Sequence, residues 1–235
     1  MPPDLTLLDA AAFAWFLMLW IGYNLAQEYL MRGHVVNQHL RSIRVHWMER
    51  MLDRENRIMD SQLVGHTINS CTFFASTTIL ILAGLLGSFG AIEHAHEIIS
   101  NLSFAVKSSR QFFELKMLLL VVIFVFGFFK FTWALRQYNY CCALLGSAPL
   151  VIDDPVERRM MAENIAEALT LGVGALNGGL RSYYFALAAL AWIIHPWLFI
   201  LGSTGVLITL LRRQAFSNTE KVIRAQARAL EKHGR

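Results

Sequence analysis

The sequence has little charge and few cysteines, and both shortages narrow the class of protein. Only 16% of its 235 residues are charged, whereas soluble domains carry about 25%. The three cysteines, Cys71 and the adjacent Cys141 and Cys142, are odd in number and match neither a disulfide framework nor a zinc site. A disulfide-stapled secreted domain and a zinc module are therefore not expected.

Motifs for catalysis and phosphate binding are also absent. The chain has no Gly-x-Ser-x-Gly, no P-loop, no His-Glu-x-x-His and no glycine-rich dinucleotide turn. His94 and His96, flanked by Glu93 and Glu97, are a weak metal signal on their own. We therefore predict a protein that is not an enzyme and holds no metal or cofactor. Its basic residues lie in blocks between apolar runs, so no nucleic-acid partner is expected.

Long apolar runs dominate the chain. Hydrophobic residues make up 55% of it and the mean hydropathy is +0.43. We predict an all-α fold, a polytopic helical membrane bundle that forms a single domain over residues 1–235. Runs of about 20 apolar residues predict transmembrane helices, and four such runs cover residues 5–25, 66–87, 117–135 and 182–211.

The last run is longer than a membrane requires. At 1.5 Å per residue it spans about 45 Å, against a hydrocarbon core of about 30 Å. It must tilt, protrude or bend, and Pro196 is the natural position for a kink.

The connections are predicted to hold helices of their own. Apolar residues at three-to-four spacing, with arginines between them, predict an amphipathic helix over residues 38–62 that runs into the second span. Asp154 and Pro155 have the residue types of a helix start. Glycines follow, and residues 166–180 could re-enter or cross the membrane. A basic helix is expected at residues 217–233.

The distribution of basic residues leaves the orientation open. Nothing basic precedes Arg32, and the first apolar run is too long for a secretory signal, so we expect it to be retained as a span. With four crossings and the N-terminus outside, ten basic residues fall on each side, a tie under the positive-inside rule. An outer N-terminus and an inner C-terminus together require an odd number of crossings. The expected location is the bacterial inner membrane.

Polar residues inside the apolar runs are the candidate functional residues. Asn69, Thr72 and Ser76 fall on one helical face of the second run. They either hold helices together or line a hydrated path. Lys130 lies inside the third run, where a charge costs about 2.5–3.5 kcal/mol on insertion scales. It either pairs with an acidic residue such as Asp9 or contacts an anion or lipid headgroup.

Two arginines extend this set. Arg136 closes the third run and Arg181 opens the fourth. Antiparallel neighbouring spans would place both on the same side as Lys130. The three would then form a cationic cluster facing one vestibule.

Several segments resemble a known family of membrane proteins. They are WMERMLDRENRIMDSQLVGHTINSCTFFASTTILIL, FFKFTWALRQYNYCCALLGSAP and GLRSYYFALAALAWIIHPW. In this order they resemble the family known as domain of unknown function 599, found in bacteria and plants, over about residues 13–211. Gly65, His66 and Thr67 depart from its pattern, where a more basic segment is expected. The resemblance implies the fold and the span count but no activity.

Two functional hypotheses follow from these features. The first is an oligomeric channel or transporter, with the polar second-span face and the cationic cluster contacting solute or lipid headgroups. The alternative is a non-catalytic structural or accessory subunit of a membrane complex. The expected partners are anionic lipids and further copies of the same chain.

Overall fold

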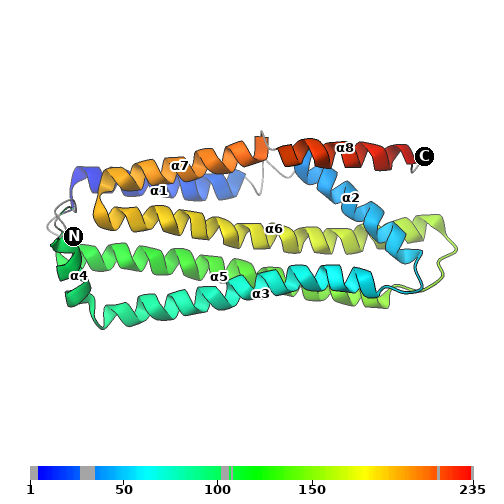
Figure 1. The fold of residues 1–235 in the computed structure, drawn as a ribbon, viewed down its shortest axis with the longest axis horizontal. Helices are drawn as coiled ribbons and strands as arrows, with labels where there is room; N and C mark the ends of the chain where they lie inside the picture. Colours follow the sequence, from blue (N-terminus) through cyan, green and yellow to red (C-terminus); the bar gives the residue numbers. More distant parts are fainter. Residues whose placement is uncertain (1–4, 27–34, 102–105, 107, 216–217, 234–235) are drawn as a thin grey trace. The chain divides into compact units, whose positions relative to one another are not determined.

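The structure of the chain, a computed structural model, describes residues 5–26, 35–101, 106, 108–215 and 218–233. Within these residues the fold is all-α and contains no strand, which confirms the predicted class (Figure 1). Its helices are α1 (Leu7–Leu25), α2 (Val35–Leu52), α3 (Ile58–Phe89), α4 (Ile92–Ser100), α5 (Arg110–Ser147), α6 (Pro155–Ile194), α7 (Pro196–Ala215) and α8 (Asn218–His233). Arg32, Lys107 and Arg235, which enter the count of basic residues, lie outside the described residues.

Three of these helices, α1, α3 and α5, are long and apolar enough to cross a membrane by length and composition. They contain the first three predicted spans almost entirely. The Thr6 hydroxyl oxygen caps α1 by accepting from the Asp9 backbone N–H at 3.1 Å. These helices indicate a membrane protein.

The predicted fourth span is in fact two helices, so a single kinked span over residues 182–211 is wrong. α6 ends at Ile194 and α7 begins at Pro196, and Figure 1 shows the chain turning back between them. The Trp192 and Phe199 rings stack at 4.8 Å, and the backbone of Ala188 lies 3.6 Å from where a Cβ on Gly202 would stand. In both pairs the two residues lie at nearly equal distances along the chain before and after His195. This is the contact pattern of two antiparallel helices in a hairpin.

Proline causes this reversal by starting a helix rather than bending one. A proline has no N–H to continue a preceding helix, but the first position of a helix needs none. The ring Nδ1 of His195 accepts from the Trp197 N–H at 3.1 Å and so caps α7. The prediction missed this second use of Pro196.

Two further predicted segments differ from the structure. The amphipathic helix over 38–62 ends at Leu52, and α3 starts separately at Ile58, whose N–H donates to the Asn56 side chain at 3.0 Å. Residues 166–180 neither break nor re-enter, because they lie within the uninterrupted α6. Gly172 serves close packing there: an added Cβ would lie 2.5 Å from the Tyr138 ring.

Two predicted helices of the connections are confirmed. α6 begins at Pro155, and the Val156 N–H donates to the Asp154 carboxylate at 2.9 Å, as expected for an N-cap. α8 covers the predicted C-terminal basic helix, apart from residue 217, which lies outside the described residues.

The chain divides into two compact units. Unit 1 consists of the chain through α1 and of residues 76–129 and 178–211. Unit 2 consists of α2 with the residues that follow it as far as 75, of residues 130–177, and of the residues from 212 onward. α3, α5 and α6 each supply residues to both units.

Aromatic rings fill the core of unit 1. Phe16 of α1 contacts Phe185 of α6 at 5.9 Å and Phe199 of α7 at 4.9 Å, between ring centroids. Trp20 meets Phe126 of α5 edge-on at 5.5 Å. α3 is tied to this unit by a 3.0 Å hydrogen bond between the hydroxyls of Thr78 and Tyr183. Four helices therefore share one apolar core, with α3 beside it.

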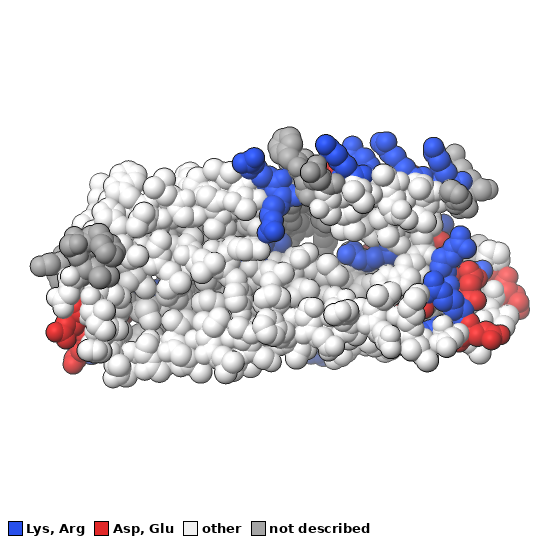
Figure 2. Space-filling view, viewed as in Figure 1, with Lys and Arg blue, Asp and Glu red and all other residues white. Residues whose placement is uncertain are grey.

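Unit 2 combines an apolar core with many ion pairs. Phe74 and Phe131 stack at 5.8 Å, and α8 packs along α2. In the described residues, unit 1 has three basic side chains, Arg110, Lys116 and Arg181, and every other Lys and Arg belongs to unit 2. On the face shown in Figure 2, basic side chains gather along α8 and near the ends of α2 and α6.

Candidate functional site

The predicted polar face of α3 points away from the rest of the chain. Asn69, Thr72 and Ser76 are all exposed. Only 11% of the apolar window of α3 is buried, against 50% for α5, so α3 is a peripheral helix. Among the described residues the Asn69 amide has no hydrogen-bond partner, whereas the neighbouring Ser70 hydroxyl donates to the His66 carbonyl at 3.1 Å.

The polar residues of α5 lie mostly at the surface of unit 2. Lys130 is half-buried, while Trp133, Arg136, Asn139 and Tyr140 are exposed. The Arg136 Nε donates to the Tyr140 hydroxyl at 2.7 Å. α5 thus presents a mixed aromatic and cationic face there.

Arg181 is bound by α1. It belongs to unit 1, whereas Lys130 and Arg136 belong to unit 2. Its Nε lies 3.4 Å from the Asn24 side-chain oxygen, and its guanidinium lies 5.9 Å from the Tyr23 ring centroid. A common cluster of these three cations stays a prediction.

Among the described residues, the Lys or Arg with the smallest exposed fraction is Lys116, near the start of α5. Lys116 lies in unit 1 and is only 2% exposed. The ammonium lies 4.5 Å from the Phe112 ring centroid and 5.7 Å from that of Trp192. These cation–π contacts supply part of the stabilisation that the charge loses on leaving water.

Asp9 supplies the opposite charge for this buried amine. It is 3% exposed and interacts electrostatically with Lys116. Its Oδ1 accepts from the Trp192 indole N–H at 2.9 Å, and its Oδ2 accepts from the Thr6 hydroxyl at 2.5 Å. The carboxylate is therefore well satisfied, and Trp192 contacts both charges.

Helix direction is the sequence signal that could have revealed this pair. Spans in odd positions along a membrane chain run in the same direction, so the starts of the first and third spans share one side. Asp9 and Lys116 both stand close to those starts.

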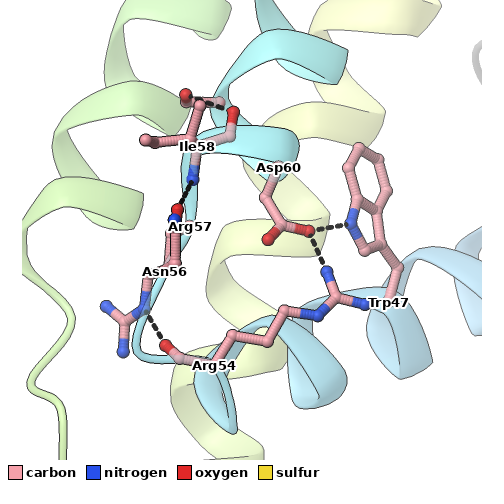
Figure 3. Close-up of polar contacts among 7 residues, drawn as sticks. Trp47, Arg54, Asn56, Arg57, Ile58 and Asp60 are labelled. Atoms are coloured by element: carbon pink, nitrogen blue, oxygen red, sulfur yellow. Dashed lines mark hydrogen bonds and ion pairs between the residues drawn. The ribbon is translucent and has the colours of Figure 1, made fainter.

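A second buried carboxylate holds the corner between α2 and α3 (Figure 3). Asp60 is fully buried, and its Oδ1 accepts from the Trp47 indole at 2.7 Å and from Arg54 at 2.6 Å. Its other oxygen has no partner among the described residues.

Arg57 ties the same corner to the loop after α5. Its guanidinium donates to the carbonyls of Ala148 and Pro149 at 2.6 and 2.8 Å. These contacts fix where α3 begins, and hence where Asn69 stands along the helix.

The His-x-His segment does not form a metal site with its neighbours in the described residues, where no group of three or more His, Cys, Asp or Glu could hold an ion. The Nε2 of His96 lies 2.6 Å from the Ser108 carbonyl. Glu93 pairs with Arg110 instead.

Comparison with known proteins gives one match. Residues 11–219 match the family described as "Protein of unknown function, DUF599", which confirms the resemblance drawn from the sequence segments. No curated protein and no solved structure matches the chain.

Proposed function

The chain belongs to the DUF599 family, and on this premise we propose that it is an oligomeric membrane protein of channel or transporter type. It is not an enzyme in this proposal. Its solute path is lined by the exposed polar face of α3, formed by Asn69, Thr72 and Ser76, with copies of the chain surrounding it.

The exposed Asn69 amide carries the proposal. It stands on a helix long and apolar enough to span a membrane, without a partner in the described part of its own chain. An unsatisfied polar group in lipid costs several kcal/mol. Either water in a path or another copy of the chain removes this cost, and a ring of copies around an axis supplies both.

The core of unit 1 supports a path between copies rather than through one. Aromatic side chains from α1, α5, α6 and α7 occupy its interior. The polar groups of α3 that face this interior are already bonded, as the Thr78–Tyr183 contact illustrates. These contacts support a hydrated face outside this core.

The hairpin at Pro196 supports a five-crossing topology. Unit 1 contains α4 and segments of α1, α3, α5, α6 and α7, and in this proposal the antiparallel α6 and α7 each cross the membrane once. Because α2 and α8 carry many of the basic residues, the positive-inside rule favours a cytoplasmic side for these two helices and an outer N-terminus. The exposed Arg212 and Arg213, at the end of α7, then meet anionic headgroups of the bacterial inner membrane.

Flux through reconstituted protein tests the proposal. Liposomes containing the purified protein are loaded with K⁺ and Cl⁻, and ion flux is measured against empty liposomes. We expect flux above that baseline, and we expect Asn69→Leu to reduce it several-fold. Ser70→Ala is the matched control, because the Ser70 hydroxyl is already bonded to its own helix.

Two results would contradict the proposal. The first is a monomer by mass in detergent that also fails to conduct in liposomes. The second is equal flux for Asn69→Leu and the wild type. Wild-type flux equal to that of empty liposomes, together with a stable co-purifying partner, would favour the accessory-subunit alternative.

A further inference from the structure

Unit 2 has a cleft that does not include the polar face of α3. Its volume is about 410 Å³, within the 300–1,000 Å³ range of small-molecule sites. Residues from α2, from the start of α6 and from α8 line it: His46, Glu49, Arg50, Asp53, Pro155, Arg158, Arg159 and Leu230. Three arginines and a histidine in one cleft are unusual for a chain with so few charges.

Two of the three arginines that line the cleft form ion pairs, and the third does not. Arg158 pairs with Asp53, and the Arg159 Nη1 lies 3.5 Å from a Glu49 carboxylate oxygen. Both lining carboxylates therefore have an arginine partner. Arg50, which is exposed, has no partner among the described residues.

Hydrogen-bond donors also remain in excess. A guanidinium has five N–H groups, and the printed contacts of Arg158 and Arg159 use only some of them. His46 has one ring nitrogen, Nδ1, within 2.9 Å of the Ser42 carbonyl, which can only accept. That nitrogen therefore donates to the carbonyl, and Nε2 of the neutral ring is an acceptor that adds no donor to the cleft.

We propose that this cleft binds a small phosphate-bearing anion, with Arg50 as its main charge contact. A phosphate group has three terminal oxygens and suits several converging N–H donors, whereas a carboxylate has two. Leu230 offers an apolar wall for an organic substituent. The site lies entirely within unit 2 and does not rest on the proposed channel function.

Titration with inorganic pyrophosphate tests this site. The full-length protein in uncharged detergent is titrated by calorimetry at fixed ionic strength. We expect saturable binding with one site per chain, and binding about tenfold weaker for Arg50→Gln, the loss expected for one charge-assisted contact. Arg228→Gln is the matched control, because Arg228 is exposed and does not line the cleft.

The outcomes separate a built site from general charge attraction. An unchanged Arg228→Gln affinity with a weakened Arg50→Gln supports the site. Equal weakening of both variants, or no saturable heat with the wild type, overturns it. The unfolding midpoint of Arg50→Gln without anion should equal the wild-type value, since Arg50 has no partner to lose; its stabilisation by pyrophosphate then gives a second readout of binding.

Discussion

The buried charge pair in unit 1 yields the sharpest stability prediction. Asp9→Asn removes the negative charge near Lys116 but keeps an acceptor for the Trp192 indole and a partner for the Thr6 hydroxyl. The substitution therefore changes mainly the electrostatics. Lys116→Met removes the amine and keeps an unbranched apolar side chain of similar length.

The magnitude follows from burial and separation. Two unit charges 4 Å apart interact by about 4 kcal/mol at an effective dielectric of 20. No direct ion pair joins Asp9 and Lys116 among the described contacts, so we expect Asp9→Asn to destabilise by about 2–3 kcal/mol. Lys116→Met should also destabilise, by about 1–3 kcal/mol, because it leaves the buried Asp9 carboxylate without its counter-charge, although the hydrogen bonds from Trp192 and Thr6 remain.

The double variant isolates the interaction. If Asp9 acts through the charge of Lys116, then Asp9→Asn should cost less than about 1 kcal/mol in the Lys116→Met background. Unfolding from mixed micelles, followed by tryptophan fluorescence, measures all four proteins. Glu93→Gln is the control for a surface charge: its side chain is 79% exposed, and exposed pairs contribute about 0–1 kcal/mol.

Additive effects of the two substitutions would refute this reasoning. So would a large loss from Lys116→Met in the Asp9→Asn background, because it would assign the stability to the amine's packing rather than to the charge pair. An Asp9→Asn protein with the same free energy of unfolding as the wild type would show that Lys116 needs no counter-charge.

Two other predictions rest on the helices that build the units. Gly172→Ala should destabilise because its Cβ would meet the buried Tyr138 ring at 2.5 Å, while Gly174→Ala, two residues away in open space, should gain up to about 1 kcal/mol of helix propensity; equal unfolding midpoints would contradict the contact. In a cysteine-free background, a membrane-impermeant maleimide should label Glu97→Cys from outside intact cells and Arg228→Cys only after permeabilisation. Labelling of both from one side would contradict five crossings.

Three apolar helices and the start of α6 could be predicted from the sequence because they depend on local chemistry. Apolar runs long enough to cross a membrane specify α1, α3 and α5. Asp154 and Pro155 specify the start of α6, since a capping side chain and a fixed φ act within one turn. These features need no knowledge of which helices are neighbours.

The hairpin and the corner could not be predicted because they depend on tertiary contacts. Pro196 is equally compatible with a kink and with a new helix, and the stacked pair of Trp192 and Phe199 favours the second. The break before Ile58 likewise depends on Asp60, which gains its hydrogen bonds from Trp47 and Arg54 only when α2 folds back on α3.

The five crossings proposed above would also remove the tie in the count of basic residues. Four spans placed the basic C-terminal segment opposite the arginines of α2, so the two contributions cancelled. Counting α6 and α7 separately adds one crossing, and α8 then belongs to the same unit as α2, along which it packs. A positive-inside count is therefore only as good as the number of crossings on which it is based.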